Sequence, residues 1–392
     1  MALIGRSEFI LQHVHQPRPG RHQASPESGG CRRLESEVVP MRVSSTIAVR
    51  CISALLAGLL GLLYFAVPEG RAQGEAKQPI PVQFSFDHPI DAAAAPVLLA
   101  SAKGLFNAEG LAVTSSTASG SADAIARVAA GTSDFALADI NELIRFRGKA
   151  DAPHVKAVFV LFNQSPYAII ARKSRGIHAL SDIEGKTLGV AEGDLSIRLW
   201  PALARQNGLK IAGVKQSKIG AAVREPMLSA GQVDAVTGLS YLSAVNLRDR
   251  GIPADDLAVL RYADYGCEAY GLALIVNPAF AADRPEAVKG FVRALIAGTH
   301  LAIKQPERAV DEAVSRMDGG SRDLELERLR ALIADNILTG EVRRYGIGGV
   351  DPARLERSIA AIAEDFKFGK RPSAADIFDD SFLPPLDSRL VN

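Results

Sequence analysis

The sequence has little cysteine, few aromatic side chains and almost no net charge. It holds three cysteines in 392 residues, 6% aromatic residues with a single Trp, and 45 Lys and Arg against 44 Asp and Glu. The net charge of +1 offers no basic excess, so we expect no nucleic-acid partner. Hydrophobic residues at 47% and charged residues at 23% exclude a disordered chain, a coiled coil and a collagen-like repeat.

Long hydrophobic runs are also scarce, and residues 52–67 form the single long uncharged one. Arg42 and Arg50 precede this run, and small residues at 70–74 follow it, an order typical of a secretory signal. The run is shorter than the roughly 20 apolar residues of a membrane-spanning helix, although an uncleaved anchor stays open as an alternative. We therefore expect a signal peptide at 41–74 and a periplasmic protein.

The first 40 residues do not fit a normal signal. They are rich in Pro, Gly, His and Arg and show no periodic apolar pattern. We hypothesise that Met41 is the true start and that residues 1–40 are an upstream misreading. Removal of the signal would also remove Cys31 and Cys51, leaving Cys267 alone without a disulfide partner.

The rest of the chain alternates strand-like and helical patterns up to about residue 277, and helical patterns follow. Expected strands lie at 82–86, 111–115, 135–138, 155–162, 167–171, 187–190 and 233–237, and expected helices at 95–102, 121–130, 141–147 and 197–206. Strands separated by helices of about ten residues predict an α/β fold with mixed, mostly parallel sheets and helices on both faces. Later helices are expected at 306–316, 321–337 and 352–366, before an extended strap at 371–385.

Familiar catalytic signatures are missing. The triplet 185–187 (Gly-Lys-Thr) lacks the upstream glycine and the strand of a phosphate-binding loop. The four histidines after residue 74 have no metal-ligand spacing, so we expect no metal and no cofactor. We interpret the chain as a binding protein for a small molecule, not an enzyme.

Candidate binding residues follow the expected strands, because ligands of parallel α/β sheets bind beyond the carboxyl ends of strands. They are Asp87, His88, Ser119, Gly120, Ser121, Asp139, Asn163, Gln164, Ser165, Asp194, Leu195, Ser196, Trp200, Thr237, Gly238 and Tyr241. Several carboxylates and few Lys or Arg in these loops, Arg198 being the nearest, favour a ligand with amino or ring N–H donors over a bare anion. Each acidic residue could instead be a simple helix cap.

The order of several short motifs resembles one family of transport proteins. The motifs include Ala95-Pro96, Lys103–Phe106, Glu109–Leu111, Gly131–Phe135, Ser165-Pro166, Gly185-Lys186, Gly231–Val236, Asp264–Gly266 and Arg371–Ser373. Together they are similar to the solute-binding proteins of ABC transporters in the nitrate, sulfonate and taurine class, with the branch for thiamine-pyrimidine precursors as the nearest match.

This resemblance implies a two-lobed type II periplasmic binding protein. Lobe 1 would hold 80–165 and 265–390, lobe 2 would hold 170–262, and a pyrimidine-like or sulfonate-like ligand would bind between them. The partner would be a membrane permease, and the protein would be a monomer.

The resemblance also bears on the site. It adds Tyr265 to the candidate ligand contacts. The pyrimidine branch often has Trp where His88 stands, so in this chain the aromatic wall would come instead from Trp200, Tyr241 or Tyr265. The related pyrimidine synthases use a Cys-rich stretch and an active His, which Cys267 alone does not supply. An enzyme derived from the same fold, or a sensor lobe held by the N-terminal run, remain the alternatives.

Overall fold

The computed structural model describes residues 78–191, 193–364 and 366–391, which belong to the compact unit Gly74–Asn392. The expected misread start at 1–40, the signal peptide at 41–74, Cys31 and Cys51 lie outside the described residues. Within the described ranges, no helix combines the length and the apolar character needed to span a bilayer.

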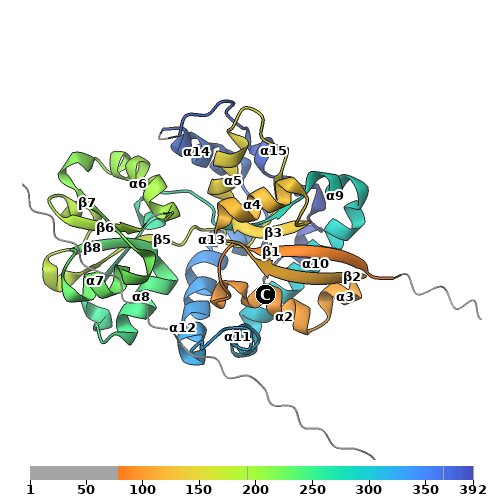
Figure 1. Ribbon diagram of the computed structural model, residues 1–392, viewed down its shortest axis with the longest axis horizontal. Helices are drawn as coiled ribbons and strands as arrows, with labels where there is room; N and C mark the ends of the chain where they lie inside the picture. The colour runs from red at the N-terminus through yellow and green to blue at the C-terminus, as the bar shows by residue number, and fades with distance from the viewer. Residues whose placement is uncertain (1–77, 192, 365, 392) are drawn as a thin grey trace, which may run out of the picture. The chain divides into compact units, whose positions relative to one another are not determined.

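The first lobe is built on a five-stranded sheet (Figure 1). Its strand order is β2 (Leu111–Thr117), β1 (Ile80–Phe86), β3 (Phe135–Asp139), β10 (Leu272–Val276) and β4 (Lys156–Val160). Strand β1 pairs in parallel with β2 and with the central strand β3, whereas β10 runs antiparallel to β3 and β4. Strand β10, which enters this sheet after the chain has formed the second lobe, is thus the one that runs in the opposite direction.

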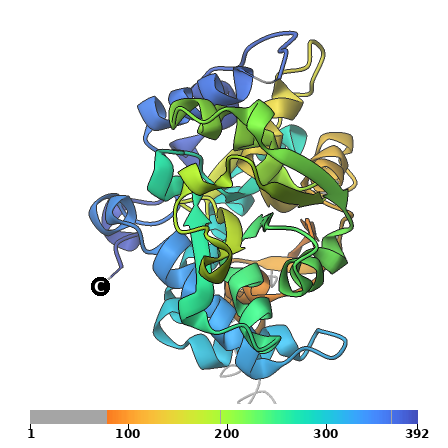
Figure 2. The same cartoon turned by 90° about the vertical axis from the view of Figure 1, so that its left-hand side faces the viewer.

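The second lobe repeats this pattern in another five-stranded sheet, turned toward the viewer in Figure 2. Its order is β7 (Lys215–Ile219), β6 (Thr187–Ala191), β8 (Ala235–Leu239), β5 (Tyr167–Arg172) and β9 (Leu257–Arg261). Here β6 is parallel to β7 and β8, and the entering strand β5 is antiparallel to β8 and β9. The expected mixed, mostly parallel sheets are confirmed, while the exact lobe boundaries stay a prediction.

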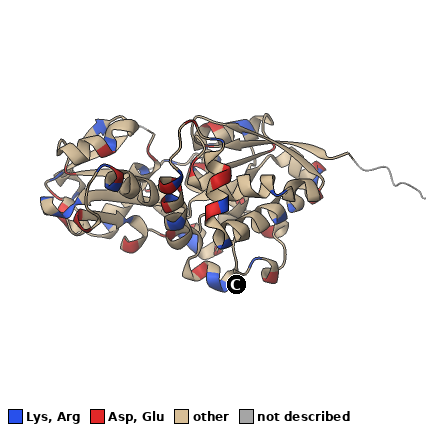
Figure 3. Cartoon of the chain, turned by 90° about the horizontal axis from the view of Figure 1, so that it is seen from below, with Lys and Arg blue, Asp and Glu red and all other residues tan. Residues whose placement is uncertain are grey.

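Helices connect and cover these strands. Those of the N-terminal part are α2 (Ala95–Ala102), α3 (Leu105–Ala108), α4 (Ser121–Ala130) and α5 (Ile140–Arg147), and those of the second lobe are α6 (Leu195–Gln206), α7 (Arg224–Ala230) and α8 (Ser240–Asp249). The C-terminal part adds α9 (Pro278–Asp283), α10 (Pro285–Lys304), α11 (Pro306–Val314), α12 (Arg322–Leu332), α13 (Gly340–Tyr345), α14 (Pro352–Ala363) and α15 (Ala374–Ile377). Acidic and basic residues are interspersed along these helices (Figure 3).

Three expected elements differ from the structure. The helix expected at 321–337 is α-helical only to Leu332 and continues as a five-residue π-helix. The strand expected at 155–162 is shortened to β4. The strap at 371–385 is not extended throughout, because Ser373 and Asp376 exchange hydrogen bonds that cap the short helix α15.

The core of the first lobe is organised around an aromatic cluster. Phe291 of α10 is fully buried, and its ring centroid lies 4.3 Å from that of Phe135, 4.6 Å from Phe106 and 5.7 Å from Phe84. Helix α10 therefore holds β1, β3 and α3 through one side chain. Such contacts between aromatic rings add to the free energy gained by burying their area.

We expect Phe291→Ala to lower the free energy of unfolding by about 3–5 kcal/mol, since it removes a large buried ring and leaves a cavity. Denaturant unfolding followed by circular dichroism would measure the loss. Tyr345→Ala is the matched control, because that ring is 57% exposed and its removal should cost little. If both variants lost the same free energy of unfolding, Phe291 would not be the main contact of this aromatic cluster.

Candidate functional site

A cavity of about 280 Å³ lies where the strands of both sheets end. Its walls come from loops that follow β1, β3 and β6 and from the segments that connect the sheets, in keeping with ligand sites of open α/β sheets. Eight of the expected binding residues line it: Asp87, His88, Gly120, Ser121, Asp139, Asp194, Leu195 and Tyr241. The sequence thus located this cavity from both lobes.

The other nine expected residues do not line the cavity. Thr237 and Ser196 stand directly behind it, where both hydroxyl groups donate to Asp194, and Ser119 instead bonds to Asp123. The remaining six are buried in the core or bond to other parts of the protein: Asn163, Gln164, Ser165, Trp200, Gly238 and Tyr265. A direct contact of any of the nine with a ligand stays a prediction.

Those six residues have structural partners or environments of their own. Asn163 bonds to Thr339, Glu341 and Arg354, and the backbone N–H of Gln164 donates to Asn336. The N–H of Ser165 donates to Ala269, Gly238 closely approaches Ser243, and the Tyr265 carbonyl accepts from Asn207. Trp200 is fully buried in the core. The aromatic wall that we expected therefore comes from Tyr241 alone among the three candidates, joined by Phe162 and Tyr167.

His88 is held between two carboxylates of the first lobe. Its Nδ1 lies 2.5 Å from Asp87 Oδ1 and its Nε2 lies 3.1 Å from Asp91 Oδ1. Burial opposes the charged imidazolium, but the charges of Asp91 and Asp87 outweigh it, so the pKa of His88 rises well above its usual value of 6.5. Although 34% of its side chain is exposed, the two carboxylates thus favour the protonated form of His88.

Asp139 forms the floor of the cavity. Its Oδ1 accepts from the N–H and the side-chain amide of Asn141, and its Oδ2 accepts from the Tyr167 hydroxyl. Burial disfavours the ionised form more than these bonds favour it, which raises the pKa of Asp139 to about 6. This carboxyl group therefore changes charge just below neutral pH.

Ser121, the first residue of α4, forms hydrogen bonds to both Asp87 and Asp139. Its Oγ donates to Asp87 Oδ2 at 2.5 Å and accepts from the N–H of Asp139 at 3.1 Å. The adjoining Gly120 has a φ of 121°, a conformation that suits glycine, and no side chain caps the start of α4. One hydroxyl thus fixes the spacing of two cavity carboxylates.

Arg224, at the start of α7, is the charged cavity residue that the sequence analysis missed. Its Nη1 donates to Asp194 Oδ2 at 2.9 Å and to the Thr237 carbonyl at 3.0 Å. Arg198, which we had expected to be the nearest cation, pairs instead with Glu142. The signal that would have found Arg224 is the strand β7, which precedes it and was not recognised.

The carboxylates differ in how many hydrogen bonds they already accept. An ionised carboxylate has about four acceptor sites. Asp194 receives four bonds, from the N–H and hydroxyl of Ser196, from Thr237 and from Arg224. Asp87 receives one bond at each oxygen, from His88 and Ser121. Asp194 is therefore saturated, whereas Asp87 can accept from a ligand.

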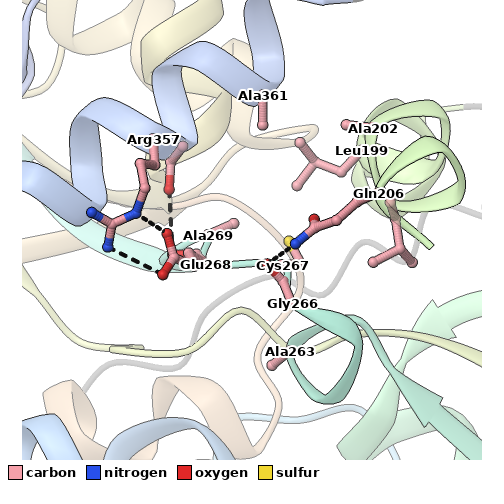
Figure 4. A pocket seen from close by; sticks show the side chains of 12 residues that line it. Leu199, Ala202, Gln206, Ala263, Gly266, Cys267, Glu268, Ala269, Arg357 and Ala361 are labelled. Atoms are coloured by element: carbon pink, nitrogen blue, oxygen red, sulfur yellow. Dashed lines mark hydrogen bonds and ion pairs between the residues drawn. The ribbon is translucent and has the colours of Figure 1, made fainter. Parts of the chain in front are cut away.

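A larger cavity, with a volume of about 590 Å³, lies elsewhere (Figure 4). It is lined by α6, α14 and the segment 263–269, and small apolar side chains form much of its wall. Its main charged groups, Glu268 and Arg357, already pair with each other, and burial raises the pKa of the Cys267 thiol. The smaller cavity brings together more unsatisfied polar groups and is the better candidate site.

Comparison with known proteins gives relatives of more than one function. The chain is 26% identical over 216 residues to 4-amino-5-hydroxymethyl-2-methylpyrimidine phosphate synthase of Legionella pneumophila, which covers 55% of this chain and 67% of that protein. It is 29% identical over 270 residues to riboflavin-binding protein RibY of Chloroflexus aurantiacus, covering 66% of this chain and 73% of RibY. The prediction that the chain is not an enzyme is therefore wrong as a flat statement, because several curated relatives are named as that synthase.

Solved structures support the fold. The periplasmic aliphatic sulphonate binding protein SsuA of Escherichia coli matches with a TM-score of 0.62 at 14% identity, covering 78% of this chain and 94% of SsuA. This confirms the periplasmic binding protein fold. A family model described as NMT1/THI5 like matches residues 91–309, more than half of the chain, a stretch that includes Asp139, Asp194 and Arg224. The chain belongs to the NMT1/THI5-like family.

Proposed function

We propose that this protein binds a small nitrogen-bearing organic molecule between its lobes, as the solute-binding component of an ABC importer. The observation that carries the proposal is a cavity with mainly apolar walls that is also lined by Asp87. Each oxygen of this carboxylate accepts one hydrogen bond within the protein, so the carboxylate can accept further bonds from a ligand. Such cavities, apolar with a few placed polar groups, are typical of small-molecule sites.

The charges of the cavity support a ligand that donates hydrogen bonds. Four carboxylates, those of Asp87, Asp91, Asp139 and Asp194, surround two cations, His88 and Arg224. A bare anion would meet an excess of negative charge here, whereas an amino group or a ring N–H would find an acceptor. Nitrate is accordingly a poor ligand for this site.

Delivery to a membrane permease and export to the periplasm are parts of the same proposal. The apolar run at 52–67 after Arg42 and Arg50 supports export, and the fold of the importer component SsuA supports a permease partner. A pyrimidine synthase is the second candidate function, favoured by the names of several relatives.

A thermal-shift screen of the purified protein tests the proposal. The panel should hold aminopyrimidines, riboflavin, taurine, alkyl sulfonates, nitrate and aromatic carboxylates. A ligand at 100 times its dissociation constant stabilises the folded state by about 2.7 kcal/mol, which gives a clear shift. Recovery of the bound ligand unchanged supports a binding protein, and its conversion supports the synthase. No shift with any compound would contradict binding by this cavity.

We expect Asp87→Asn to weaken an aminopyrimidine by about tenfold to a hundredfold, since a hydrogen bond to a charged group contributes about 1.5–3 kcal/mol. Isothermal titration calorimetry would measure the change. Asp283→Asn is the matched control, because Asp283 is exposed at the end of α9, away from the cavity. Unchanged affinity in Asp87→Asn would remove this carboxylate from the site.

Affinity for the same amino ligand should also depend on pH. Because burial raises the pKa of Asp139 to about 6, its carboxylate is present above pH 6 and is lost as the pH falls through that value. A ligand that donates to it should therefore bind up to about tenfold more weakly for each pH unit below 6. Titrations between pH 5 and 8, with a ligand that keeps its own charge, measure this. Asp139→Asn should flatten the curve, and a flat wild-type curve would rule out the contact.

A further inference from the structure

Arg224 has donors that the described residues do not use. Both of its recorded hydrogen bonds come from Nη1, to Asp194 and to the Thr237 carbonyl. Its Nε–H is buried and has no hydrogen-bond partner among the described residues. Since a guanidinium carries five N–H donors, and since a buried donor without a partner is costly, Arg224 retains donors for a further acceptor.

The surroundings of Arg224 hold it in place without occupying those donors. The side chain is 12% exposed, and its partner Asp194 is 5% exposed and fixed by Thr237 and Ser196. Because Asp194 accepts four bonds, it acts as a positioning residue for Arg224. The pair is neutral overall, so Arg224 offers directed N–H groups more than net positive charge.

Arg224 and Asp87 belong to different lobes. Asp87 follows β1 of the first sheet, and Arg224 lies beyond β7 of the second. The same cavity is also lined by the apolar side chains of Phe162, Leu239 and Leu272. A ligand that contacts both lobes therefore meets an acceptor at one end, apolar side chains along its body, and donors at the other end.

We propose that the ligand is a neutral, flat amino-oxo heterocycle, with its amino group on Asp87 and its exocyclic carbonyl oxygen on Arg224. Arg224 is then the residue that selects for the carbonyl. This inference rests on the proposed binding function and adds the orientation and chemical class of the ligand. A carbonyl suits the site better than a sulfonate or a phosphate, because the charge of Arg224 is already balanced by Asp194 and further carboxylates surround the cavity.

Three probes separate the two ends of the ligand. Cytosine carries both the amino group and the carbonyl, 4-aminopyrimidine lacks the carbonyl, and pyrimidin-2-one lacks the amino group. Calorimetric affinities of the full protein, of Arg224→Lys and of Asp87→Asn would be compared, with Arg224→Met as a further variant. Arg224→Lys keeps a cation beside Asp194 but loses the guanidinium fork, so it protects the fold while testing the contact.

We expect the wild-type protein to bind cytosine at least about tenfold more tightly than either partial probe. Arg224→Lys should abolish the preference for cytosine over 4-aminopyrimidine and leave the preference for cytosine over pyrimidin-2-one. Asp87→Asn should do the reverse. A purely structural role of either residue would not produce this crossed pattern, because it would affect the three probes alike.

The outcomes distinguish this inference from the function on which it rests. Binding of the probes with equal affinity, or losses that do not follow the crossed pattern, overturns the inference alone. Binding of an alkyl sulfonate, with none of the three heterocycles bound at 10 mM, also overturns it and leaves a solute-binding function standing. No binding of any compound overturns both.

Discussion

One buried carboxylate, that of Asp139, connects the parts of the structure on which the site depends. It ends β3, caps α5 through the Asn141 N–H, and accepts the hydroxyl of Tyr167 at the start of β5. The Asn141 amide also donates to the carbonyl of Tyr270, just before β10. Both segments that run between the sheets are therefore bonded to one short stretch of the first lobe. Burial makes its negative charge costly, and the three hydrogen bonds that the Asp139 carboxylate accepts offset that cost in part.

From this point a chain of hydrogen bonds runs around the cavity. The N–H of Asp139 donates to Ser121, whose hydroxyl donates to Asp87, and Asp87 and Asp91 share His88. Asp91 in turn accepts the hydroxyl of Tyr241 from the second lobe at 3.2 Å. The side chains that would face a ligand are thus positioned by one another before it binds. Preorganisation of this kind lowers the entropy lost on binding, which favours tight binding by a cavity of modest volume.

The sequence predicted several elements whose buried faces are apolar, but it missed the polar strand β7 and also β9, whose side chains are mostly apolar. Helices α2 and α4 were predicted with their observed bounds, and β1, β3, β5 and β6 within two residues, because small or apolar side chains dominate them. Strand β7, with the sequence Lys-Gln-Ser-Lys-Ile, is an edge strand with mostly exposed side chains and gives no alternating pattern. Since β7 was missed, the loop behind it was not examined, and Arg224 escaped notice. Hydrogen-bond saturation, which separates Asp194 from Asp87, depends on side-chain placement and cannot be read from spacing.

The number of charged groups on the cavity wall is therefore a poor guide to what the cavity selects. Asp194 and Arg224 compensate each other, and His88 is shared by Asp87 and Asp91, so much of the charge is satisfied internally. The groups that can still bond to a ligand are the unused acceptor sites of Asp87 in one lobe and the unused N–H donors of Arg224 in the other. A ligand that lacks the matching group would leave a desolvated polar atom unpaired, and that penalty discriminates more strongly than an added attraction.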